Sequence, residues 1–151
     1  MSDFDLPITM QSPRRHRRAV AQLVNQERAR HGLRPLRFTP SLGVSARTWA
    51  VVQVRNSRFG HGNWQRRVLR FPYILAGRPR TRAVGENIAA ATGGFTTPRE
   101  IVQDWMRSPG HRANILRNWD YGAVWSSRDT PDPGRQRDGV TVVHHFGRRI
   151  R

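Results

Sequence analysis

The chain has no cysteine, no lysine and no long apolar run. Without cysteine, neither a disulfide framework nor thiolate chemistry is available. No apolar stretch approaches the roughly 20 residues that a membrane-spanning helix needs, so we expect no membrane span. The N-terminal run MSDFDLPITMQSP lacks the apolar core of a signal peptide, and its first charges are acidic. We therefore expect a chain that is not exported by that route, or one whose leader has been removed.

Acidic residues are also scarce. Ten of them face 27 basic residues, all arginine, which gives a formal net charge of +17. Arginine keeps its charge and forms paired hydrogen bonds with phosphate and carboxylate groups. The imbalance predicts an anionic macromolecular partner, such as an acidic protein, a cell-wall polymer or a nucleic acid backbone that is not read by sequence. A host bias toward arginine is the alternative; it explains the missing lysine but not the shortage of acids.

The densest positive charge lies in the run RRHRR, at the start of a predicted helix. Positive charge at a helix N-terminus opposes the helix dipole, which favours a bound anion there. The side chains predicted to contact the polyanion are therefore Arg14, Arg15, Arg17 and Arg18. A solvated helix start is the alternative interpretation.

The length of 151 residues predicts one domain. We expect an irregular N-terminal arm over residues 1–13 and a single domain over residues 14–151. Helical spacing and capping residues predict helices over 14–32, 39–56 and 97–108, and a short helical segment over 111–116. The stretch 58–84 is less regular and has one candidate helical turn in residues 66–75.

The last part of the chain has a strand-like pattern. The runs YGAVWSS and GVTVVHHFG are rich in β-branched and aromatic residues, and a turn-rich loop separates them. These two runs predict a β-hairpin. With helices first and strands last, the expected class is α+β, in which helices pack on a small, mostly antiparallel sheet.

Three short motifs carry candidate functional residues. FGHG contains His61, GENIAAA contains Glu86 and SPGHRANIL contains His111. In order along the chain with LVNQERARHGLRPL, ARTWA, YGAV and VVHHFG, they make the sequence resemble the CAP superfamily. That superfamily is named for cysteine-rich secretory proteins, antigen 5 and pathogenesis-related 1 proteins. The resemblance is to the bacterial SCP-like type, and it runs from about residue 18 to residue 147.

The resemblance implies a three-layer α-β-α sandwich with a cleft shared by His61, Glu86 and His111. Many members have a second glutamate after the tryptophan of the third helix, where this chain reads WMRSPG with Ser108 near that place. Asn87 and Asn114 are expected to shape the cleft loops together with Ser108, and Trp64 is expected at the cleft rim. Members are usually secreted, whereas this chain begins without a recognisable leader.

The chemistry of the cluster can be considered separately from the resemblance. Two imidazoles and one carboxylate suit Zn²⁺ or another divalent metal, with an open position for water. Without metal, a histidine and a glutamate can act as a base and the group that orients it. Neither Ser57 nor Ser108 lies in a nucleophile motif, which argues against serine hydrolysis. A purely structural role, in which these side chains bond to the backbone, is the alternative.

Two further features follow from the motifs. By the resemblance, Arg28 is expected to be a structural ion-pair partner. His144 and His145 alternate on a strand, so only one of them is expected to face inward.

These observations predict a binding module. Its cleft would hold a divalent metal or a small ligand, and its arginine-rich surface would dock on an anionic partner. Two alternatives remain at this point: a structural component of a larger particle, virion-like or containing nucleic acid, and a metal-dependent hydrolase. The compartment stays open between a secreted protein and a part of such an assembly.

Overall fold

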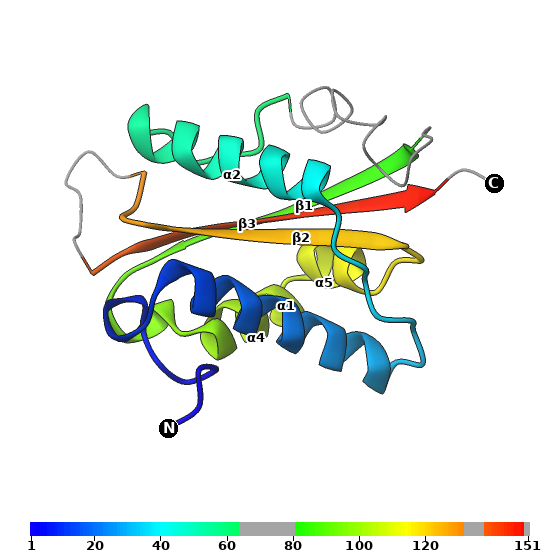
Figure 1. Ribbon diagram of the computed structural model, residues 1–151, viewed down its shortest axis with the longest axis horizontal. Coiled ribbons are helices and arrows are strands. Elements are labelled where there is room, and N and C mark those ends of the chain that lie inside the picture. The colour runs from blue at the N-terminus through cyan, green and yellow to red at the C-terminus, as the bar shows by residue number, and fades with distance from the viewer. Residues whose placement is uncertain (64–80, 132–137, 150–151) are drawn as a thin grey trace.

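The protein folds as helices on both faces of one antiparallel sheet (Figure 1). The structure is a computed structural model that describes residues 1–63, 81–131 and 138–149. Its elements are η1 (Ile8–Met10), α1 (Pro13–Arg30), α2 (Pro40–Arg55), β1 (Thr81–Ala91), η3 (Gly93–Thr96), α4 (Pro98–Arg107), α5 (Pro109–Ile115), β2 (Tyr121–Arg128) and β3 (Val140–Arg149). Helix α2 covers one face, and α1, α4 and α5 cover the other. This arrangement confirms the predicted three-layer sandwich.

Helices α1, α2 and α4 begin within one residue of the predicted positions, because each start carries a capping residue followed by proline, whereas α5 begins at Pro109 and not at residue 111. Ser12, Thr39 and Thr97 accept hydrogen bonds from backbone N–H groups in the first turns of α1, α2 and α4. Each cap satisfies a donor that has no partner within the helix. Proline at the first helical position costs nothing there, since its missing N–H is one of those unpaired donors.

The sheet has three strands in the order β1-β3-β2, and both neighbouring pairs are antiparallel. The predicted hairpin is confirmed, with Tyr121 opposite Gly147 and Arg128 opposite Val140. Strand β1, which contains the GENIAAA motif, was not predicted. Its sequence contains four alanines and one glycine, and Gly85–Ile88 are buried without interruption. A strand covered on both faces does not show the alternation that reveals a half-buried one.

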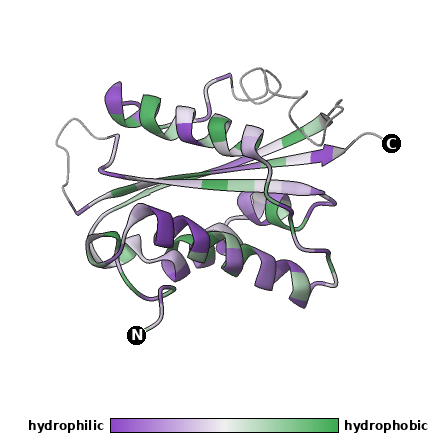
Figure 2. Ribbon diagram, viewed as in Figure 1, coloured by the Kyte–Doolittle hydropathy of each residue, from purple (hydrophilic) through white to green (hydrophobic). Residues whose placement is uncertain are grey.

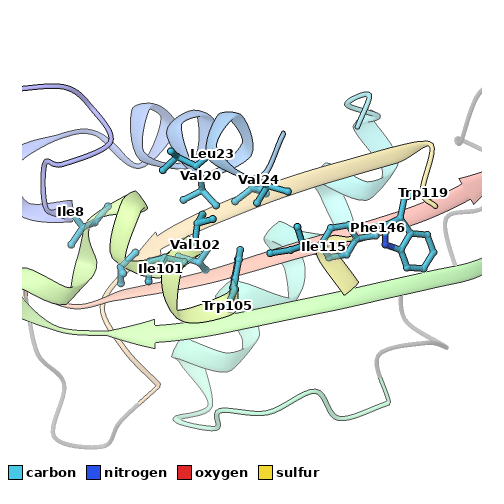
Figure 3. Packing of buried hydrophobic residues seen from close by; sticks show 13 residues of the cluster. Ile8, Val20, Leu23, Val24, Ile101, Val102, Trp105, Ile115, Trp119 and Phe146 are labelled. Atoms are coloured by element: carbon cyan, nitrogen blue, oxygen red, sulfur yellow. The ribbon is translucent and has the colours of Figure 1, made fainter. Parts of the chain in front are cut away.

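The larger part of the core lies between the sheet and the layer of α1, α4 and α5. Figure 3 shows its side chains, among them Val20, Leu23, Ile101, Trp105 and Phe146. A smaller cluster on the other face joins Ala46 and Ala50 of α2 to Ile88 and Val143. Because both faces are covered, His144 and His145 are both buried, at 2% and 0% exposure. The expectation that only one of them faces inward is therefore wrong.

Helix α1 is largely hydrophilic along its length (Figure 2), yet one of its arginines is in the interior. Arg28 is 1% exposed and donates to the carbonyl oxygens of Ile115 and Arg117 at 2.7 Å each. It also donates to the carbonyls of Arg34 at 2.9 Å and Trp119 at 3.4 Å. The expected ion-pair role is thus replaced by bonds to backbone carbonyls, which hold the ends of several segments together.

The N-terminal arm packs onto the domain rather than extending from it. Ile8 in η1 is 1% exposed and belongs to the main core cluster, and its N–H donates to Thr96 Oγ1 at 3.0 Å. Among the described residues, no helix combines the length and apolar character that crossing a bilayer requires.

Candidate functional site

Glu86 is the centre of the candidate site. It lies on β1, and its side chain has no exposed surface. Its Oε1 is 2.8 Å from Nδ1 of His61, and its Oε2 is 2.6 Å from Nε2 of His145. An ionised carboxylate only accepts hydrogen bonds, so each of these ring nitrogens carries the proton that faces Glu86. The buried charge is thereby held by two imidazoles, as a buried carboxylate requires.

His145 continues this set into the core. It is directly opposite Glu86 in the pairing of β1 with β3, and both side chains point toward α2. On its other side, Nδ1 is 2.6 Å from Oγ of Ser45, and the carbonyl oxygen of Leu42 lies 3.0 Å from the same hydroxyl. The order Ser45–His145–Glu86 matches that of a serine–histidine–acid triad. However, Ser45 is only 3% exposed, so its hydroxyl is not placed to attack a substrate.

His61 forms the outer end of the set, with its side chain 47% exposed. It lies in the loop after α2, and that loop is fixed to the helix at Gly60. The Nε1–H of Trp49 donates to the Gly60 carbonyl, and the Gly60 N–H donates to Gln53, both at 3.0 Å. Gly62 then takes a φ of +54°, a conformation that favours glycine, and turns the chain after His61.

His111 on α5 lies beside this set. Partial burial is the main cause that lowers its pKa from the ordinary value, and the charge of His61 lowers it further. The second contribution places the ring of His111 within reach of the charge that His61 carries when protonated. Both effects disfavour the imidazolium, so His111 is a neutral ring at neutral pH. His61 and His111 thus present two imidazoles at the surface above the buried Glu86.

Two asparagines connect α5 to β1 next to these histidines. The side-chain amide of Asn87 donates to the carbonyl of His111 at 3.0 Å. Asn114 donates to the carbonyl of Glu86 at 3.1 Å and to Oδ1 of Asn87 at 3.0 Å. These bonds fix the position of His111 relative to Glu86. Ser108 lies at the junction of α4 and α5 without a side-chain cap bond, and Trp64 lies outside the described residues.

Of the predicted residues, hydrogen bonds join His61, Glu86, Asn87 and Asn114 in one set, and that set includes the backbone carbonyl of His111. Within residues 1–63, 81–131 and 138–149, no group of three or more potential ligands is arranged to hold a metal ion. Both oxygens of Glu86 already face imidazole nitrogens. The sequence did not predict that Ser45 and His145 belong to this hydrogen-bonded set. The signal for His145 is its place in VVHHFG, on the strand that pairs with the glutamate strand.

The run RRHRR does not present one uniform surface. His16, in its centre, is fully buried, with Nδ1 2.8 Å from Ser126 Oγ and Nε2 2.6 Å from the Thr96 carbonyl. Arg15 forms an ion pair with Asp3 at 2.7 Å. The guanidinium of Arg17 lies 4.1 Å from the centre of the Trp125 ring. Of the four arginines predicted to contact a polyanion, Arg14 and Arg18 are the two that are exposed and take part in neither of these contacts.

Comparisons with known proteins agree on one family. The sequence profile of CAP, the cysteine-rich secretory protein family, matches residues 21–119. The uncharacterized protein YkwD of Bacillus subtilis (strain 168) is 35% identical over 124 residues, which cover 75% of this chain and 46% of that protein. The chain therefore spans about half the length of the curated relative that it matches.

Solved structures show the same fold at low sequence identity. An outer surface protein of Borrelia burgdorferi superposes with a TM-score of 0.71 at 16% identity, covering 88% of this chain and 92% of that one. An extracellular protein from Bacillus anthracis str. Ames that contains an SCP domain gives 0.69 at 22% identity, covering 92% and 44%. A cysteine-rich secretory protein from Staphylococcus aureus gives 0.67 at 16% identity, covering 92% and 40%.

Proposed function

The chain belongs to the CAP family, and from that membership we propose that it is a binding module. Its cleft, formed by His61, Glu86 and His111, binds a small polar ligand or a divalent metal ion. Its arginine-rich surface docks on an anionic partner. The extracellular description of the Bacillus anthracis relative supports a site of action outside the cell.

One observation carries the cleft proposal: the hydrogen-bonded set that runs from buried Ser45 through His145 and Glu86 to the half-exposed His61. A carboxylate without exposed surface is stable only because its partners are fixed, and this fixes the ring of His61 in turn. His111 adds a neutral imidazole, which offers one donor and one acceptor. Two oriented imidazoles at the surface suit recognition of a small polar molecule.

A metal site that uses all three groups as ligands requires a rearrangement. Zn²⁺ would accept His61 and His111 as ligands. The third group, Glu86, holds His61 through Oε1, so a metal would have to replace that hydrogen bond. The small polar ligand therefore fits the arrangement of the described residues better, and zinc is the direct probe for the other possibility.

The test combines calorimetric titration with Zn²⁺ and native mass spectrometry of the protein purified from its own source. We compare the wild type with His61→Ala and His111→Ala. The control is His31→Ala, which removes an exposed histidine outside the cleft. For the wild type we expect either a bound small molecule, seen as added mass in the native spectrum, or heat of Zn²⁺ binding in the titration. His61→Ala and His111→Ala should lose this binding, and His31→Ala should keep it. A wild-type protein with neither, or a signal that all three variants keep, would contradict the cleft proposal.

The second part of the proposal rests on the unbalanced charge. Arg14 and Arg18 are exposed on α1, and the chain as a whole carries +17. Titration with inorganic polyphosphate at several salt concentrations tests it, because each neutralised phosphate releases counterions. We expect Arg14→Gln combined with Arg18→Gln to weaken binding and to reduce the salt slope by about 1 per lost contact. Arg30→Gln combined with Arg107→Gln serves as the control of equal charge, and an equal loss there would rule out a defined surface.

A further inference from the structure

A cavity lies between α1 and the sheet, away from the candidate cleft. The strand order is β1-β3-β2, so Glu86 on β1 is at one edge of the sheet and this cavity, beside β2, is at the other. Helix α1 runs alongside β2 there (Figure 1). The volume of the cavity is ≈ 330 Å³, which is at the small end of the range for small-molecule sites. Its walls come from α1, from the segment between α1 and α2, and from β2.

The cavity opens to solvent beside exposed side chains. Arg18, Gln22 and Phe38 all line it, and Phe38 is 69% exposed. Arg17 also borders it, but its guanidinium turns toward Trp125 and lies 4.1 Å from the centre of that ring. Within the described residues Arg18 forms no ion pair, so its charge is available to an anion that enters the cavity.

His144 of β3 forms the inner end of the cavity and is 2% exposed. Its ring stacks on Phe146, with the ring centres 4.0 Å apart. Neither of its nitrogens has a hydrogen-bond partner among the described residues. A Cβ atom at Gly122, which also lines the cavity, would lie 2.8 Å from Nε2 of His144. Because glycine lacks that atom, Nε2 faces the cavity, whereas Nδ1 is enclosed in the core.

The chemistry of this nitrogen indicates what it would bind. Burial lowers the pKa of His144 to about 3, and the charges of His145 and Arg28 act in the same direction, so the ring is neutral. A neutral imidazole has one N–H group and one lone pair. A hydroxyl group both donates and accepts, so it suits Nε2 in either tautomer. A buried polar atom without a partner costs free energy, and a hydroxyl at Nε2 would remove that cost.

The space between the histidine and the opening is apolar and its walls are fixed. Leu36 and Val124 line it from two sides. The N–H of Leu36 donates to Oδ1 of Asn25 on α1 at 2.8 Å. The N–H of Gly122 on β2 donates to the carbonyl of Arg37 at 3.0 Å. A preformed apolar pocket with one polar group at each end suits a small molecule with the matching pattern.

We propose that this cavity binds a small aromatic carboxylate that has a hydroxyl group on its ring, at the end away from the carboxylate. The hydroxyl bonds to Nε2 of His144, the ring lies against Leu36 and Val124, and the carboxylate binds Arg18. An aromatic ring buries apolar area with few rotatable bonds, so it loses less conformational freedom than a flexible chain. This site is separate from the cleft of the proposed function and adds a second ligand to it.

The probes are para-hydroxybenzoate, para-hydroxyphenylacetate and para-hydroxyphenylpropionate, which differ in the distance between the hydroxyl and the carboxylate. Calorimetric titration measures their binding. NMR of protein with isotope-labelled histidine reports on Nε2 of His144, whose signal is assigned by its loss in His144→Leu. We expect at least one compound to bind and to shift that signal.

Two control compounds divide the interaction into its parts. The same molecule without the hydroxyl, and its methyl ester without the charge, should each bind about tenfold more weakly. Equal binding of the compound without the hydroxyl, or a series in which no member binds, would overturn the proposal.

Protein variants test the same assignment from the other side. His144→Leu should bind the compounds with and without the hydroxyl equally, a loss of preference that a merely structural role would not produce. Arg18→Gln should weaken binding of the carboxylate about tenfold, whereas Arg30→Gln, on the same helix but outside the cavity, should not. If His144→Leu fails to fold, the hydroxyl comparison in the wild type still decides.

One further variant separates this site from the cleft. Binding that His61→Ala abolishes and His144→Leu leaves intact would place the compound in the cleft and overturn this inference. Binding that His61→Ala leaves unchanged is expected here, and it would hold whether or not the cleft takes a ligand of its own.

Discussion

Glu86 and His145 face each other across the pairing of β1 with β3, and their side chains meet at 2.6 Å with no exposed surface on either. The candidate site is therefore built into the sheet itself. The loop after α2 and helix α5 then bring His61 and His111 to its outer end. Stability and the proposed binding share one carboxylate, so a change at Glu86 should affect both properties.

Glu86→Gln tests the role of the buried carboxylate. The amide NH₂ of glutamine would face a ring N–H where the carboxylate now accepts, leaving a buried donor without a partner. We expect the free energy of unfolding to fall by about 1–3 kcal/mol in urea denaturation. Asp104→Asn is the control, because that side chain is 59% exposed and should change little. Equal effects in the two variants would show that Glu86 is not needed by the fold.

The buried histidines should make stability depend on pH. Burial lowers the pKa of His144 to about 3, and the charges of His145 and Arg28 act in the same direction. In the unfolded chain a histidine titrates near 6.5, so the unfolded state binds the proton more readily below that pH. Stability should therefore fall as the pH decreases from 6.5 toward 3, by up to about 1.4 kcal/mol per pH unit for this group.

His144→Leu provides the measurement. Nδ1 of His144 has no hydrogen-bond partner in the described residues, and the ring stacks on Phe146, so an apolar side chain suits the position. Urea denaturation across this pH range should show a flatter profile in the variant. Some slope should remain, because burial also lowers the pKa of His16. An unchanged profile would assign the pH dependence to other groups.

Arg28→Lys should destabilise the fold although the charge is kept. Lysine cannot reproduce the planar group of donors with which Arg28 reaches the carbonyls of Ile115 and Arg117. We expect a loss of about 2–3 kcal/mol in the free energy of unfolding. The exposed Arg30 makes a surface pair with Glu27, so Arg30→Lys should be close to neutral. Similar values for both variants would contradict this assignment.

Gly85→Ala tests the contact between β1 and the core. A Cβ atom at Gly85 would lie 2.7 Å from Cζ2 of Trp119, a ring fixed in the core. We expect a loss of about 1–3 kcal/mol from this overpacking. At Gly110 in α5, a Cβ atom meets nothing within 4 Å. Gly110→Ala should therefore raise stability slightly, because alanine favours the helix. Thermal unfolding should therefore show a lower Tm for Gly85→Ala and a higher Tm for Gly110→Ala than for the wild type.

The sequence predicted the elements whose determinants are local. Ser12, Thr39 and Thr97 mark helix starts through bonds to neighbouring N–H groups, and the β2–β3 hairpin shows in its β-branched runs. Strand β1 was missed because its alanines and glycine carry no strand pattern of their own. Its conformation depends on β3 on one side and on covering layers on both faces.

The same distinction applies to the site. His61, Glu86 and His111 were identified because their motifs resemble a family, and family membership is shown by the profile match. The bond between Glu86 and His145 joins residues 59 positions apart, so it depends on strand register. The burial of Arg28 depends on carbonyls as many as 91 positions away. Local patterns do not contain that information.

The bonds of Arg28 have a consequence for the conditions under which this fold can persist. One side chain ties the end of α1 to carbonyls of residues 115–119, which are 87 to 91 positions away in the sequence, and it does so without a covalent bond. The hydrogen bonds of a guanidinium need no oxidant to form, and no reductant can break them. The chain can therefore keep the same architecture in an oxidising or a reducing medium.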